Sequence, residues 1–169
     1  MNMTEKRARR NSAGYTLIEV VISAALIVLI SVVVLKFWIN TSEAFTLDSN
    51  RAVLKQQSER ALEIMTERIS QGTNGTFVLS NGNSTLDFVD GSDLSNIQYT
   101  LNPLAPTAPA WGEIVQTIDG VQGPIGGYAQ TLQFTTSPTG LITINATFST
   151  GRGRTQTTLT VQSSVAARN

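Results

Sequence analysis

A long apolar run near the start of the chain leads to the first prediction. Between Tyr15 and Leu35 there are 21 residues, and Glu19 is the only charged residue among them. A helix of this length spans the hydrocarbon core of a bilayer. A carboxylate inside such a span costs on the order of 2.5–3.5 kcal/mol, so it is usually retained for a function. The pattern therefore predicts a transmembrane helix over 15–35 whose single acid needs a positively charged partner.

The helical pattern continues beyond the apolar run. Residues 15–71 contain neither glycine nor proline, so we expect one continuous helix of about 85 Å, its first half in lipid and its second half outside. At 100° per residue the second half has one apolar face, made of Leu47, Leu54, Ser58, Ala61, Leu62, Met65 and Ile69. The opposite side carries a charged stripe that we expect to face solvent, made of Lys55, Glu59, Glu63 and Glu67. Gly72 stands where a C-cap glycine would end the helix.

Beyond Gly72 the apolar residues alternate with polar ones, which indicates strands. The expected strands are Thr76–Ser80, Thr85–Val89, Ile97–Leu101, Thr131–Thr136, Leu141–Phe148 and Thr155–Val165. Asn81-Gly82 is a hairpin signal between the first two. Residues 102–127 hold four of the five prolines and five glycines, so we expect a long loop region there with one strand at Glu113–Ile118. The sequence thus predicts an α+β fold in which the long helix packs against an antiparallel sheet.

Charge is distributed unevenly, although the formal net charge is zero. Residues 1–14 carry a net charge of +3, and residues 15–169 carry a net charge of −3. By the positive-inside rule, this places the N-terminus in the cytoplasm and the rest of the chain outside. A signal peptide also has a basic start, but this apolar run is longer than a typical signal h-region, and Leu35–Trp38 is too bulky for signal peptidase. We therefore expect the apolar segment to be retained.

The residue types that are missing exclude most catalytic chemistry. The sequence has no cysteine and no histidine, which removes disulfides, thiolate metal sites and the commonest general base. The lysines outside residues 1–14 are Lys36 and Lys55, and both lie on the expected helix. A Ser–Lys dyad in the globular part is therefore excluded. We predict no enzymatic activity and no cofactor.

Three further groups of residues each have two interpretations. Three carboxylates lie around Gly91: Asp87, Asp90 and Asp93. They could either surround a hard cation such as calcium or form an exposed acidic turn. Three arginines make the C-terminal end basic: Arg152, Arg154 and Arg168. They could contact phosphate, as DNA binding requires, or simply be solvated. Trp111 is either an exposed binding residue or the residue that packs a loop onto the core.

Glu19 also has two interpretations on physical grounds. It is either a polar residue at the interface whose side chain reaches the lipid headgroups, or the partner of an α-amino group freed by cleavage between Gly14 and Tyr15. Such an amine on one subunit would neutralise Glu19 of a neighbour in a medium of low dielectric. That pair would set the axial register of packed helices.

The run Gly14-Tyr15-Thr16-Leu17-Ile18-Glu19-Val20 resembles the prepilin processing motif of type IV pilins and of the pseudopilins of type II secretion. The resemblance implies that prepilin peptidase cuts after Gly14 and methylates Tyr15, and that Glu19 guides assembly. Tyr15 stands where phenylalanine is more usual. The proline that many pilins have in the middle of the membrane segment is absent, as are paired C-terminal cysteines.

The resemblance also implies a division of the chain and a function. Residues 1–14 are a cleaved leader, 15–71 the long helix with its transmembrane half at 15–35, and 72–169 an extracytoplasmic β-rich, pilin-like domain. The chain is then a structural, minor subunit of a type IV pilus or type II secretion pseudopilus, acting in filament assembly or at the tip. Its end, Val165-Ala166-Ala167-Arg168-Asn169, is similar to that of J-type minor pseudopilins and related minor pilins.

The expected partners follow from this resemblance: the prepilin peptidase, other pilin or pseudopilin subunits and an inner-membrane assembly platform. The expected location is the bacterial cytoplasmic membrane as a single-pass protein, and then an extracytoplasmic filament that serves secretion, DNA uptake, adhesion or motility. The alternative is a membrane-tethered extracytoplasmic binding or adhesion domain that is not cut and does not polymerise.

Overall fold

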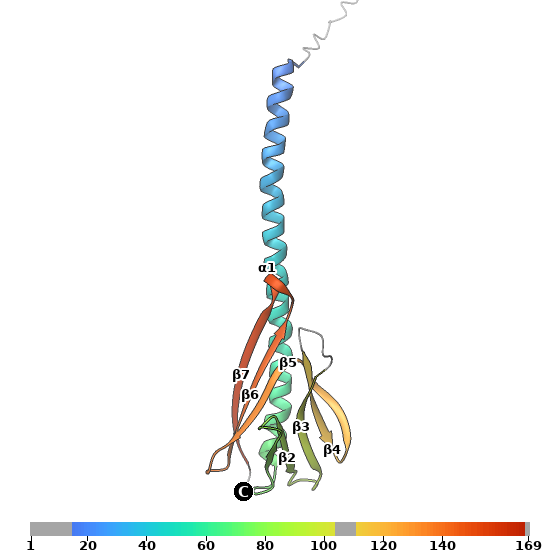
Figure 1. Ribbon diagram of the computed structural model, residues 1–169, viewed down its shortest axis with the longest axis vertical. Coiled ribbons are helices and arrows are strands. Elements are labelled where there is room, and N and C mark those ends of the chain that lie inside the picture. Colours follow the sequence, from blue (N-terminus) through green and yellow to red (C-terminus); the bar gives the residue numbers. More distant parts are fainter. Residues whose placement is uncertain (1–14, 104–110, 168–169) are drawn as a thin grey trace, which may run out of the picture. The chain divides into compact units, whose positions relative to one another are not determined.

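A computed structural model describes residues 15–103 and 111–167 (Figure 1). The chain divides into two compact units, Met1–Ser42 and Glu43–Asn169. The helix α1 (Leu17–Gln71) contributes to both of them. It ends at the predicted residue and is uninterrupted, as expected for a segment without glycine or proline.

The second unit contains a seven-stranded antiparallel sheet whose strands lie in the order of the sequence. The strands are β1 (Val78–Ser80), β2 (Thr85–Val89), β3 (Asn96–Pro103), β4 (Gly112–Ile118), β5 (Val121–Thr136), β6 (Leu141–Thr150) and β7 (Thr157–Ala166). A short 3₁₀ turn, η1 (Gly153–Thr155), connects the last two. Each strand pairs with the next one in the sequence. The α+β architecture predicted from the sequence is confirmed.

The turn between β1 and β2 has the predicted chemistry. Asn81 and Gly82 have φ angles of +51° and +63°, in the left-handed region that asparagine and glycine tolerate best. Directly outside the turn, Ser80 pairs with Thr85. The hairpin signal read from the sequence is therefore confirmed.

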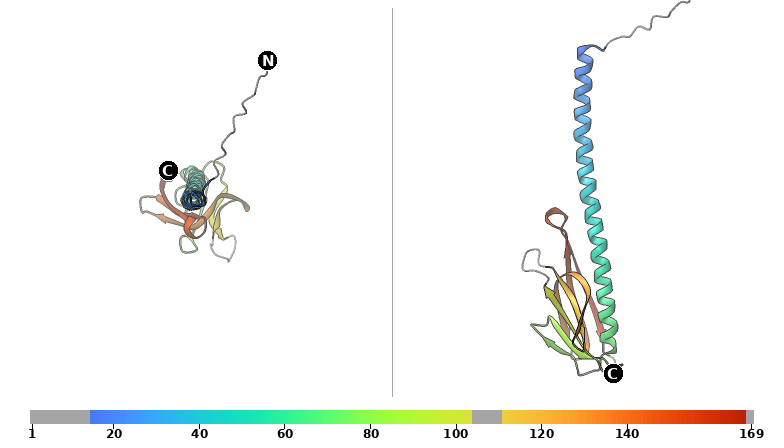
Figure 2. Two further views of the ribbon diagram at one scale, coloured as in Figure 1. Left: turned by 90° about the horizontal axis from the view of Figure 1, so that it is seen from above. Right: turned by 90° about the vertical axis from the view of Figure 1, so that its right-hand side faces the viewer.

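Within the second unit, α1 lies along one face of the sheet, as both views in Figure 2 show. The face predicted from the helical period is the face that packs: Leu54, Ser58, Ala61, Met65 and Ile69 are buried, and Leu47 and Leu62 are half-buried. Each fully buried large apolar side chain contributes about 1.5–3 kcal/mol to folding. The charged stripe is exposed, as predicted, at Lys55, Glu59, Glu63 and Glu67.

The prediction of a long loop region at 102–127 is wrong for most of its length. β3 extends to Pro103, and β4 and β5 pair as a hairpin around Asp119 and Gly120, both of which have positive φ. Residues 104–110 lie outside the described residues. Among the described residues, Pro103 and Gly112 occupy strand ends, and Pro124 and the glycines of β5 lie in an irregular pairing with two register shifts.

One of these glycines is required by close packing. A Cβ at Gly126 would stand 2.8 Å from the Cβ of Ala61 on α1, closer than two carbon atoms can approach. The strand therefore crosses the helix at a point where only glycine fits, which a single sequence does not distinguish from a loop glycine.

Gly72 follows the helix as predicted, but for a different reason. Its φ is not among the positive values, so it does not form a left-handed cap. A Cβ at this position would come within 2.6 Å of the Phe77 ring and 2.8 Å of the Phe88 ring. The glycine therefore makes room for these two stacked rings, whose centroids are 5.1 Å apart.

Candidate processing and assembly site

The first turn of α1 is capped by Thr16. The carbonyl oxygen of Thr16 accepts hydrogen bonds from the backbone N–H groups of Glu19 at 3.0 Å and Val20 at 3.2 Å. Its hydroxyl accepts a second, longer contact from the Glu19 N–H at 3.4 Å. A threonine followed three residues later by glutamate is the spacing of a capping box. The Thr16-Leu17-Ile18-Glu19 spacing is a signal in the sequence from which this cap can be predicted.

Glu19 therefore lies in the first turn of α1. The positive end of the helix dipole favours a carboxylate at this position, which lowers the cost of an acid near the membrane. No ion pair within the described residues includes Glu19. Gly14, the predicted cleavage residue, lies outside the described residues. Tyr15, the predicted new N-terminus, precedes the helix and is 81% exposed.

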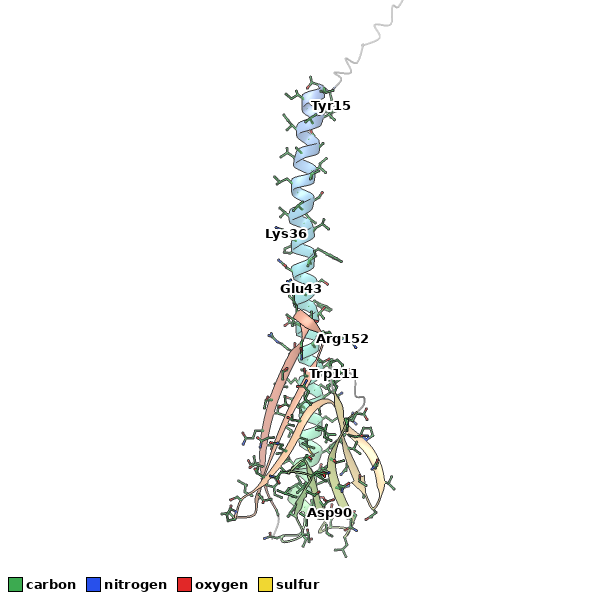
Figure 3. The ribbon with its side chains drawn as sticks, viewed as in Figure 1. Tyr15, Lys36, Glu43, Asp90, Trp111 and Arg152 are labelled. Atoms are coloured by element: carbon green, nitrogen blue, oxygen red, sulfur yellow. The ribbon has the colours of Figure 1, made fainter. Side chains whose placement is uncertain are left out.

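The segment 17–35 has its apolar side chains exposed around the whole helix, as Figure 3 shows. Soluble proteins rarely expose contiguous apolar surface of this extent, so the segment needs a lipid or protein environment. Among the described residues, α1 is the one helix long and apolar enough to span a membrane, judged by length and composition. The hydroxyl of Ser31 donates to the carbonyl of Ile27 at 2.8 Å, so this polar group has a partner inside the helix.

The end of the apolar run has the composition of a membrane interface. Lys36 follows Leu35, and Trp38 is 68% exposed two residues later. Tryptophan and lysine are favoured at the headgroup level because each joins an apolar body to a polar end. The composition of this segment therefore fits a membrane anchor whose boundary is near residue 36.

Asp90, one of the three candidate cation ligands, is engaged by protein groups instead. It is fully buried at the end of β2, and Arg68 Nη1 donates to its Oδ2 at 2.9 Å. The backbone N–H and the hydroxyl of Ser92 donate to its Oδ1 at 2.8 and 2.6 Å. Burial by itself raises the pKa of Asp90, but the hydrogen bonds from Ser92 and the nearby Arg68 outweigh it and hold the pKa below 3.8.

The other two carboxylates also have their own partners. Asp93 accepts hydrogen bonds from the Ser95 hydroxyl and N–H, which lower its pKa. Asp87 accepts a hydrogen bond from Gln98 Nε2 at 2.7 Å. No group of three or more acidic side chains that could hold a metal ion occurs within the described part of the chain. The structure thus does not bring the three aspartates together as a ligand set.

Trp111 packs against the sheet. Its ring meets that of Tyr128 edge-on, with the centroids 5.6 Å apart, beside a cavity of about 460 Å³.

The two described basic residues near the C-terminal end are exposed. Arg152 lies next to η1, and Arg154 lies within it. Figure 3 shows Arg152 and Asp90 at opposite ends of the second unit. Arg168 lies outside the described residues.

The start of the chain also carries a known motif. The prokaryotic N-terminal methylation motif matches residues 9–35, which include Gly14, Tyr15 and Glu19. The motif supports a type IV pilin-like subunit. It implies processing by prepilin peptidase and assembly with other pilin subunits, and with the apolar helix it fits membrane anchoring. No curated protein and no solved structure matched this chain.

Proposed function

We propose that this chain is a minor subunit of a type IV pilus or of a type II secretion pseudopilus, acting in filament assembly or at the tip. The observation that carries the proposal is the methylation motif at 9–35, which includes the start of the exposed apolar part of α1. The closing residues 165–169, similar to those of J-type minor pseudopilins, support the minor assignment.

In this proposal, prepilin peptidase cuts after Gly14 and methylates Tyr15. Residues 1–14 are then lost, 15–71 form the N-terminal helix with its transmembrane half at 15–35, and 72–169 form the extracytoplasmic domain. The exposure of Tyr15 ahead of the helix supports this step, because a processing enzyme needs access to the residue that it modifies.

The role of Glu19 follows from charge. The methylated amine at Tyr15 of an incoming subunit pairs with Glu19 of its neighbour while both lie in apolar surroundings. Packing of 15–35 against other helices gains little hydrophobic energy, because lipid is equally apolar. In a low dielectric the energy of a charge pair depends strongly on the distance between the charges, so the pair selects one axial register of the packed helices.

The location and the partners follow from the same steps. The chain is inserted in the cytoplasmic membrane with its N-terminus inside, and an assembly platform then moves it into the extracytoplasmic filament. The filament serves secretion, DNA uptake, adhesion or motility. In a DNA-uptake filament, Arg152 and Arg154 are exposed cations available to phosphate.

The testing experiment is the N-terminal mass of the protein isolated from membranes that contain prepilin peptidase. We expect a mature chain that begins at N-methylated Tyr15, and an intact Met1 start in membranes without the peptidase. An intact N-terminus in the presence of an active peptidase would overturn the proposal. It would support the uncut, membrane-tethered binding or adhesion domain instead.

A further inference from the structure

The strand β7 is an open edge of the sheet. The strand order leaves β1 and β7 at the two ends, and β1 has only three residues whereas β7 has ten. All ten residues of β7 pair with β6, and no other described strand pairs with them. In an antiparallel pair, alternate backbone N–H and C=O groups point away from the partner. These groups of β7 are therefore available to a further strand.

β7 lacks the features that usually protect an edge. Natural edge strands are short, charged, bulged or interrupted by proline. The sequence of β7, TTLTVQSSVA, contains no charged residue, no proline and no glycine. Its pairing with β6 shows no register shift from Thr157 to Ala166. It is a long, regular and uncharged strand that can accept another.

The inner face of the sheet is incompletely covered at this edge. The inward residues of β6, such as Ile144 and Phe148, are fully buried under α1. On β7, Leu159 and Val161 belong to the same face but are only partly buried. The cover over the sheet is therefore partial along the first half of β7, whereas Val165 near the end of the strand is buried.

A groove of about 280 Å³ occupies the uncovered space between α1 and β7. The residues that line it are Arg51, Leu54, Lys55, Thr157, Thr158 and Leu159. Leu54 and Leu159 supply apolar surface, so the groove suits an apolar side chain. It lies where a side chain from an added strand would pack against the face of the sheet.

The rim of the groove is basic. Arg51 and Lys55 belong to its lining, and their ion pairs with Asp48 and Glu59 are exposed, at 3.7 and 3.8 Å. Such pairs contribute little and exchange readily with other partners. The exposed residues Arg152 and Arg154 lie just before β7 in sequence.

The η1 turn is held close to this part of α1. Asn50 Nδ2, one residue before Arg51, donates to the carbonyl of Thr155 at 3.0 Å. The contact holds the η1 segment, which carries Arg152 and Arg154, against α1 at the residue next to Arg51 of the groove.

We propose that β7 binds an acidic, strand-forming segment of another protein as an eighth strand of the sheet. The backbone of the segment pairs with the open edge, one apolar side chain enters the groove beside Leu54 and Leu159, and its acidic side chains face Arg51, Lys55 and the η1 arginines. The charge of the rim selects an acidic partner over a neutral or basic one. This inference goes beyond the proposed function and does not depend on processing or filament assembly.

The probe for the test is a fluorescent ten-residue peptide of alternating valine and glutamate. Its binding to the full chain in neutral detergent micelles is measured by fluorescence anisotropy. The same peptide with lysine in place of glutamate tests charge selection. Hydrogen exchange of the complex then reports which backbone amides gain protection.

We expect the acidic peptide to bind, the lysine peptide not to bind, and new protection in β7. The double variant Arg51→Glu/Lys55→Glu should bind the acidic peptide at least tenfold more weakly, whereas Arg60→Glu, on α1 outside this groove, should bind within twofold of wild type. Binding without added protection in β7, or undiminished binding by the double variant, would overturn the proposal. Protection of β7 that rises with protein concentration alone would assign the edge to a second copy and also overturn it.

Discussion

Arg68 in the last turn of α1 donates to the buried carboxylate of Asp90 at the end of β2, with 2.9 Å between Nη1 and Oδ2. Two backbone contacts lie beside this ion pair. The N–H of Gly91 donates to the carbonyl of Gln71 at 2.9 Å, and Gly72 forms an isolated bridge with Asp90. The end of the helix is thereby joined to the sheet by one charged and two backbone interactions.

Replacement of Asp90 by asparagine should destabilise the second unit. The change removes the charge that Arg68 and Ser92 stabilise, so we expect the free energy of unfolding at pH 7 to fall by about 1.5–3 kcal/mol. Urea denaturation of the full chain in detergent, followed by tryptophan fluorescence, measures the difference. Asp87→Asn is the control, because Asp87 is only half-buried, and its effect should be smaller.

The contribution of the Asp90 carboxylate to the free energy of unfolding should also depend on pH. Because the pKa of Asp90 is lower in the folded protein than in the unfolded chain, the stabilisation is complete above about pH 4 and is lost as the pH falls through the folded pKa. The gap in stability between wild type and Asp90→Asn should therefore narrow from pH 5 to pH 2. A gap that stays constant over this range would contradict the lowered pKa.

Because Gly126 lies close to Ala61, adding one methyl group at Gly126 should lower the free energy of unfolding. Gly126→Ala places a Cβ 2.8 Å from the Ala61 Cβ, so we expect a loss of about 1–3 kcal/mol in the free energy of unfolding. Gly127→Ala is a matched control, because a Cβ at Gly127 meets nothing within 4 Å. Equal denaturation midpoints for the two variants would show that the strand does not cross the helix this closely.

Loss of the Thr16 cap should loosen only the first turn of α1. Thr16→Val removes the hydroxyl that accepts from the Glu19 N–H, and we expect about 0.5–1 kcal/mol of local destabilisation, a low value because the contact is 3.4 Å long. Faster hydrogen exchange at the Glu19 and Val20 amides in micelles measures it. Thr41→Val should leave these two amides unchanged, since the Thr41 hydroxyl bonds the carbonyl of Phe37.

Replacement of Glu19 by alanine should impair assembly and leave the fold intact. The side chain has no ion-pair partner among the described residues, so insertion and the stability of the second unit should match wild type. Without the charge pair between subunits, we expect at least a tenfold loss of incorporation, which corresponds to about 1.4 kcal/mol. The fraction of the subunit in sheared filaments measures incorporation, and wild-type levels would refute the assembly role of Glu19.

Local patterns in the sequence determined the helix, its two faces and most strands. The absence of glycine and proline from 15 to 71, and the 3.6-residue period that puts Leu54, Ala61 and Met65 on one side, act through the geometry of the helix itself. The exposed apolar run and the motif around Gly14 are likewise contiguous in sequence. Such features depend on neighbours a few residues away, so one sequence is sufficient to predict them.

Only the tertiary structure decided which groups separated in sequence meet. It placed the glycines and the proline of 112–127 in a strand hairpin, paired Arg68 with Asp90, and put β7 at an edge of the sheet that the described residues form. Each of these outcomes depends on pairing between distant segments, whose partners no local period encodes. A glycine that permits close packing and a glycine that permits a turn look the same until the strand lies against the helix.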